Sequence, residues 1–128
     1  MANRYGEAAL MATQQVPSRD IDPVARWESA MEKLYPASSA ARKKGCPRGA
    51  YLGLCEEGLV KGIPVGRYTT SRDNKAYAFR AVALLTEGTQ LRSTSALWRA
   101  VTNEKAHNSQ MDIVLALWNN DLIVGKRT

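Results

Sequence analysis

The segment SQMDIVLALW, residues 109–118, is apolar around most of the circumference of a helix. A helix of that kind in a small globular protein is buried, with other helices covering it on several sides. We therefore predict that residues 109–118 form the central helix of an all-α protein. The side chains that make the segment apolar are Met111, Ile113, Val114, Leu115, Leu117 and Trp118.

Segments on the N-terminal side of this helix repeat apolar residues at intervals of three and four, which is typical of amphipathic helices. They lie at residues 5–16, 22–35, 47–61, 71–87 and 93–101. Gly62 and Gly88 would end two of them, and Gly45 would end a short helix at 40–44 in the left-handed conformation. We predict a compact all-α bundle of about six helices. Its core includes Trp27, Leu54, Leu84, Trp98, Val114 and Trp118.

The 128-residue chain has the composition of a soluble globular protein, with 45% hydrophobic and 23% charged residues. The linkers between predicted helices are short, so we expect a single helical domain over residues 1–128. No apolar run reaches the roughly 20 residues that span a bilayer, and the N-terminus lacks a signal-peptide pattern. We therefore expect a cytoplasmic protein without a membrane partner.

Positive charge is concentrated in one segment of the chain. Residues 42–75 contain eight lysines and arginines and three acidic residues, whereas the other 94 residues contain ten and nine. A local excess of this kind favours the binding of a polyanion. We predict that the binding residues are Arg42, Lys43, Lys44, Arg48, Gly49, Lys61, Arg67, Tyr68, Arg72 and Lys75.

Within that segment, RKKGCPRGAYLG, residues 42–53, joins three basic residues to the start of a predicted helix. The unpaired N–H groups and partial positive charge of a helix N-terminus attract anions, so residues 46–49 form a candidate phosphate or carboxylate site that Gly49 would open to a ligand. Two simpler interpretations stay open. Gly49 and Gly53, one turn apart, would allow another helix to pack closely, and the charges would then be solvated.

Aromatic and acidic residues near the basic segment have simpler interpretations as well. Tyr68 lies in a turn between two arginines. Two interpretations suit it equally: a side chain that stacks on bases, and an ordinary packed residue. The three tryptophans all lie in apolar stripes and are interpreted as core. Glu56 and Glu57 are neighbours on a helix, so they project about 100° apart and do not converge on one substrate atom.

Covalent chemistry would depend on Cys46, because a thiol at a helix N-terminus near basic residues is stabilised as the thiolate. A nucleophile also needs a base, and the single histidine, His107, lies 61 positions away. Cys46 and Cys55, about 13 Å apart along one helix, are too distant for a disulfide and lack the spacing of a zinc site. We predict two thiols, no metal and no cofactor.

Familiar nucleotide and DNA motifs do not fit. GCPRGAYLG lacks the lysine, the hydroxyl and the preceding strand of a P-loop, and the dinucleotide fingerprint also needs that strand. A helix-turn-helix would present polar residues from its second helix, yet residues 109–118 are apolar. Nucleic acid would therefore be contacted through phosphates on the 42–75 face and not through base edges.

The sequence is similar to a small family of uncharacterised bacterial and phage-encoded proteins, a domain of unknown function that spans nearly the whole chain. The resemblance depends on GCPRGAYLGLCEEGLVKGIP, on LWRAV and on NSQMDIVLALWNNDLI. It implies no catalytic residues. The association with phages implies that host-directed roles, such as blocking a defence complex, belong among the alternatives.

Three functions follow as expectations. The favoured one is a non-enzymatic helical module that binds a polyanion, nucleic acid or a nucleoprotein, through the basic face. The alternative is an interaction protein, for instance a phage-borne inhibitor, that docks on an acidic protein surface. The third is a cysteine-dependent or phosphate-handling enzyme.

Overall fold

The computed structural model describes residues 4–14, 22–102 and 109–124, and in these ranges the regular structure is α-helical without a β-strand. The all-α prediction is therefore confirmed. The helices are α1 (Arg4–Gln14), α2 (Pro23–Leu34), α3 (Ser39–Arg42), α4 (Gly45–Glu56), α5 (Arg72–Thr86), α6 (Thr94–Val101) and α7 (Gln110–Asn119). The short helix predicted before Gly45 is the single-turn α3, with Ser38 as its N-cap.

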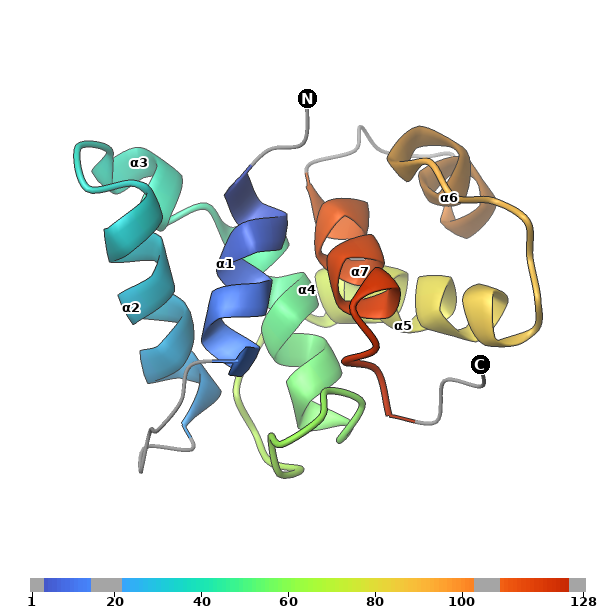
Figure 1. Cartoon of the computed structure of the whole chain (residues 1–128), viewed down its shortest axis with the longest axis horizontal. Helices are drawn as coiled ribbons and strands as arrows, with labels where there is room; N and C mark the ends of the chain where they lie inside the picture. Colours follow the sequence, from blue (N-terminus) through green and yellow to red (C-terminus); the bar gives the residue numbers. More distant parts are fainter. Residues whose placement is uncertain (1–3, 15–21, 103–108, 125–128) are drawn as a thin grey trace.

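Helix α7 is central, as its apolar circumference predicts. It packs against α1, α4, α5 and α6, and Figure 1 shows it between α1 on one side and α6 on the other. Helix α2 covers the outer side of α1, and α4 contacts α2, α5 and α7. In the described parts of the chain, no helix is both long and apolar enough to cross a bilayer.

Most of the predicted core residues are buried, and Leu84 is the exception. The three tryptophans, Leu54 and Val114 are all buried, whereas Leu84 is half-buried at the edge of the core. Helix α5 turns Ala78 and Ala81 inward because these short side chains let it lie close to neighbouring helices. The buried face of α5 is formed by Ala78, Ala81, Val82 and Leu85.

Helix α4 begins and ends earlier than the sequence predicts. Gly45 is its first residue and has no positive φ, so the prediction that Gly45 ends the preceding helix is wrong. The helix ends at Glu56 and not near Gly62, because Gly58 at φ 71° takes the left-handed conformation first. The Gly58 N–H then bonds to the Cys55 carbonyl and the Leu59 N–H to the Leu54 carbonyl, which is a Schellman motif.

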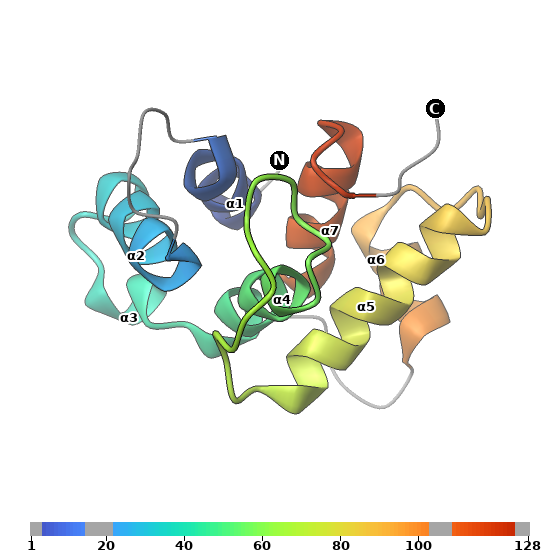
Figure 2. The same ribbon diagram turned by 90° about the horizontal axis from the view of Figure 1, so that it is seen from below.

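A long loop, residues 57–71, joins α4 to α5 and folds back over α4 (Figure 2). Its first part is tied to the segment after α7, where Val60 and Ile123 form an isolated antiparallel bridge. The Lys61 N–H donates to the Leu122 carbonyl at 2.9 Å. The loop is thereby fixed at one end before it reaches the basic residues near position 70.

Candidate functional site

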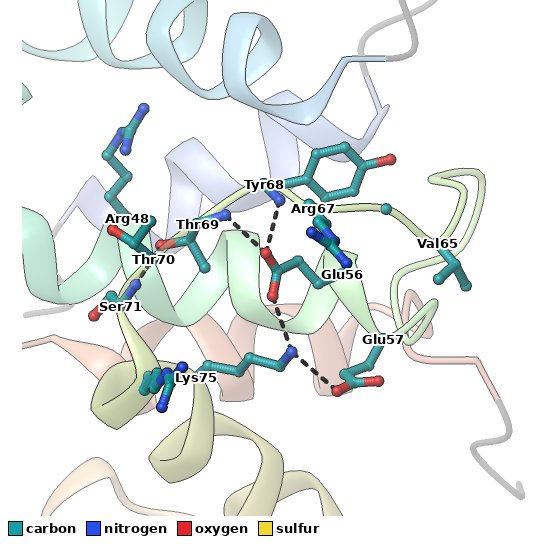
Figure 3. A pocket seen from close by; sticks show the side chains of 12 residues that line it. Arg48, Glu56, Glu57, Val65, Arg67, Tyr68, Thr69, Thr70, Ser71 and Lys75 are labelled. Carbon is teal, nitrogen blue, oxygen red and sulfur yellow. Dashed lines mark hydrogen bonds and ion pairs between the residues drawn. The ribbon is translucent and has the colours of Figure 1, made fainter.

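Glu56, the last residue of α4, fixes the second part of the loop. Its Oε1 accepts the N–H groups of Tyr68 at 2.7 Å and Thr69 at 2.9 Å, and its Oε2 accepts a hydrogen bond from Lys75 Nζ at 2.9 Å (Figure 3). The Glu56 side chain is only 10% exposed. A single carboxylate therefore holds the loop backbone and the first turns of α5 against the end of α4.

The electrostatics of this cluster follow from its hydrogen bonds. Burial by itself would raise the pKa of Glu56, but the Thr69 N–H, the Lys75 ammonium and the Tyr68 N–H together stabilise the carboxylate more, and its pKa is lowered. Hydrogen bonds to Glu56 and to Glu57 raise the pKa of Lys75. The Lys75 charge is thus shared between two carboxylates, and both acidic residues at the end of α4 are neutralised in part.

Gly49 and Gly53, two of the three glycines of α4, face α5. A Cβ at Gly53 would lie 2.6 Å from Lys75 Cβ, and one at Gly49 would lie 2.8 Å from Ser71 Oγ. The element that approaches Gly49 closely is therefore helix α5 and its N-cap, and not a ligand. This is the simpler of the two interpretations that the sequence left open for these glycines.

A hollow of about 920 Å³ opens between the loop, the end of α4 and the start of α5. Arg48 and Arg67 project from different sides of it in Figure 3. The exposed Arg67 and Arg72 have no ion-pair partner among the described residues, and Arg48 lies 3.5 Å from Glu28 of α2. The hollow is lined by Arg48, Glu56, Glu57, Val65, Gly66, Arg67, Tyr68, Thr69, Thr70, Ser71, Arg72 and Lys75.

Two smaller hollows adjoin the first one and share residues with it. One, of about 400 Å³, is lined by Glu57, Arg72, Lys75, Ala76, Phe79 and Arg80. The other, of about 330 Å³, is lined by Glu28, Met31, Glu32, Arg42, Lys43 and Arg48. Arg72 and Arg48 each belong to two hollows. We call the three together the basic band, because cationic side chains recur along its length.

The structure brings most of the predicted binding residues to this band. Arg48, Arg67, Tyr68, Arg72 and Lys75 line the main hollow, and two more line the hollow beyond Arg48. Those two are Arg42, which also donates to the carbonyls of Tyr35 and Pro36, and the exposed Lys43.

Three predicted residues lie outside the hollows. Lys44 stacks over the Tyr5 ring, with Nζ 5.6 Å from its centroid, at the contact between α1 and the start of α4. Lys61 is exposed in the first part of the loop and lines none of the three hollows. Gly49 lies under α5, as described above.

Tyr68 folds back onto its own loop. Its hydroxyl donates to the Pro64 carbonyl at 2.7 Å, and its ring is close enough to Gly66 that a Cβ there would lie 2.6 Å from Cζ. The ring is half-buried and packs against the core. These contacts favour the packed interpretation of Tyr68 over the stacking one.

Neither cysteine lines one of the three hollows of the band. Cys46 is half-buried, Cys55 is buried, and no disulfide joins them, as predicted. Burial raises the pKa of Cys55 to about 12, which keeps this thiol protonated at neutral pH. His107 lies outside the described residues. Within residues 4–14, 22–102 and 109–124, no three His, Cys, Asp or Glu side chains come together in an arrangement that would hold a metal.

Sequence reasoning missed Glu28, Glu32 and Phe79. The two glutamates come from α2, and they lie next to basic residues that are distant in sequence. They reduce the positive charge at one end of the band. Phe79 is the only phenylalanine of the chain, and the available signal was its position off the apolar stripe of its helix.

A family model gives the one positive result of the comparisons with known proteins. No curated protein and no solved structure matches the chain. The family model covers residues 2–124, which includes every described helix. The chain therefore belongs to the family of unknown function DUF6979.

Proposed function

We propose that the protein is a non-enzymatic module that binds nucleic acid, alone or within a nucleoprotein, through the basic band. The observation that carries this proposal is the pair Arg67 and Arg72, which are exposed beside the main hollow without an ion-pair partner among the described residues. Exposed guanidinium groups without an ion-pair partner are available to phosphate oxygens, which they bind in bidentate fashion.

The length of the band supports a polymeric ligand over a single small anion. Three adjoining hollows share Arg48 or Arg72 and extend from α2 across the loop to the middle of α5. A phosphate backbone presents charges at regular intervals and gains affinity from each one that is neutralised. A band with cations at several points along it suits such a ligand.

The loop is already held in place by contacts within the protein, and this supports the proposal. Glu56 accepts the N–H groups of Tyr68 and Thr69, and Lys75 is held by the same carboxylate. Arg67 and Arg72 thus extend from backbone that is already in place. A surface that is organised before the ligand arrives loses less entropy on binding.

The test is a binding measurement on paired variants. Fluorescence anisotropy with a labelled oligonucleotide at low salt compares wild type, Arg67→Ala/Arg72→Ala and Lys33→Ala/Arg99→Ala. The last pair removes the same charge from exposed residues that line none of the three hollows. We expect the first pair to weaken binding about tenfold or more and the control pair to change it little. Absence of binding by wild type would overturn the proposal.

A second candidate is a protein-interaction module, such as a phage-borne inhibitor that docks on an acidic protein surface. The observation in its favour is Val65, an apolar side chain that lines the main hollow among the arginines and is 72% exposed. Apolar contacts at the centre with charged groups at the rim are usual in protein interfaces. A pulldown with and without nuclease separates the two candidates, because a direct protein partner survives nuclease treatment.

A further inference from the structure

Phe79 is an aromatic residue that the core does not use. It lies on α5 with 47% of its surface exposed, although its neighbour Ala78 is fully buried. A phenylalanine that keeps 47% of its surface in water contributes less to folding stability than a fully buried one. Its position in the hollow of about 400 Å³, which is part of the basic band, suggests a role in ligand binding.

The hollow around Phe79 continues the phosphate-binding surface. It shares Arg72, Lys75 and Glu57 with the main hollow. Arg72 and Phe79 lie seven positions apart on α5, which is two turns and roughly 10 Å along the helix. One face of this helix thus presents a cation and an aromatic ring, with the short side chain of Ala76 between them.

We propose, on the basis of the function proposed above, that the ligand is single-stranded nucleic acid and that Phe79 stacks on one of its bases. Grooves that bind single strands combine cationic side chains along the backbone with aromatic rings on which bases stack. In a duplex the base faces are covered by their neighbours, and only base edges are accessible in the grooves. A ring on the surface of a helix therefore gains a base contact only from an unpaired strand.

Phe79 is better suited to stacking than Tyr68, the aromatic residue among the predicted binding residues. The Tyr68 ring is packed against its own loop, and its hydroxyl is bonded to Pro64. Phe79 makes no hydrogen bond that would fix its ring, and the basic residue after it, Arg80, is held at one nitrogen by the Val101 carbonyl. The Phe79 ring is thus accessible at the end of the band, next to a cation that is held in place.

Substitutions at Phe79 test the stacking directly. Phe79→Leu keeps an apolar side chain without a ring, Phe79→Ala removes the side chain, and Phe79→Trp keeps an aromatic ring. The probes are an oligo-dT of about 12 nucleotides, an abasic oligonucleotide of the same length and a DNA duplex. We expect Phe79→Leu and Phe79→Ala to weaken oligo-dT binding by about 5- to 150-fold while leaving abasic binding unchanged.

The tryptophan variant supplies a second readout. Phe79→Trp is expected to bind oligo-dT at least as tightly as wild type, and oligo-dT is expected to quench its added fluorescence more than the abasic strand does. If both non-aromatic variants bind oligo-dT as wild type does, or if wild type prefers the duplex, the stacking proposal is overturned while the nucleic-acid function stands. If wild type binds none of the probes at low salt, both proposals are overturned.

Discussion

Lys75 Nζ lies 2.9 Å from Glu56 Oε2, and this ion pair joins the beginning of α5 to the end of α4. The same carboxylate accepts two backbone N–H groups from the loop between these helices. The acidic residue of the pair therefore organises the surface that carries the exposed arginines. Under the function proposed above, its role would be to position cations that contact the ligand, and not to contact the ligand itself.

Replacing Glu56 by alanine is expected to destabilise the protein. The variant would leave two loop N–H groups without their acceptor and Lys75 with Glu57 alone, at a cost of about 1–3 kcal/mol in the free energy of unfolding. Urea denaturation followed by circular dichroism measures this. The matched control is Glu57→Ala, which removes a carboxylate that is also 3.0 Å from Lys75 but is 45% exposed, and it should cost less than about 1 kcal/mol. Equal effects of the two variants would contradict the anchoring role.

The stability of the fold should depend on pH through the same residue, Glu56. The pKa of Glu56 is lowered in the folded protein, so its carboxylate contributes stability that is fully present above the ordinary glutamate pKa of about 4.3. That contribution is lost as the pH falls from there through the lower pKa of the folded state. Denaturation at a series of pH values should show a steeper loss of stability below about pH 4.3 in wild type than in Glu56→Gln. Identical pH profiles would show that the carboxylate is not stabilised by folding.

Gly53 should be intolerant of a methyl group. Alanine favours helices over glycine by up to about 1 kcal/mol, but a Cβ at Gly53 would lie 2.8 Å from Lys75 Cα, which is backbone and cannot move aside cheaply. We expect Gly53→Ala to lower the melting temperature. The control is Gly45→Ala, where nothing lies within 4 Å and φ is not positive, and it should be neutral or stabilising. Thermal denaturation of both variants decides whether α4 and α5 approach as closely as the structure has them.

Cys46 is expected to be dispensable for binding. It is half-buried at the start of α4 and lines none of the three hollows of the band. Cys46→Ser should bind oligonucleotides as wild type does, since serine preserves the size of the side chain. A folded Cys46→Ser protein that had lost function would favour the cysteine-dependent enzyme instead.

The sequence predicted well those features that depend on neighbours along the chain. The apolar circumference of residues 109–118 could only be satisfied inside a bundle, and α7 is central. Glycine spacing gave a close contact of α4 with another helix as one of two interpretations, and the structure has that contact with α5. Where two solutions had similar local cost, the prediction failed. Gly58 and Gly62 both adopt positive φ, and the residues around them do not indicate which of the two ends α4.

The composition of the candidate site was harder to predict, because charges from different elements meet only after folding. Counting charges over residues 42–75 could not include Glu28 and Glu32, which come from α2. The count also treated Lys75 as available, whereas two glutamates hold it. Phe79 was missed because the sequence shows only that it lies outside the apolar stripe of its helix. The hollow that it lines is formed by the folded structure.

The salt dependence of binding tests the central claim most directly. Oligonucleotide affinity is measured for wild type, Arg67→Ala/Arg72→Ala and Lys33→Ala/Arg99→Ala across a series of salt concentrations. For a single strand, each phosphate contact contributes about 0.7 to the slope of log K against log salt, so loss of both arginines should flatten the slope by about 1.4 while the control pair leaves it unchanged. Equal slopes for all three proteins would contradict the assignment of the basic band as the binding surface.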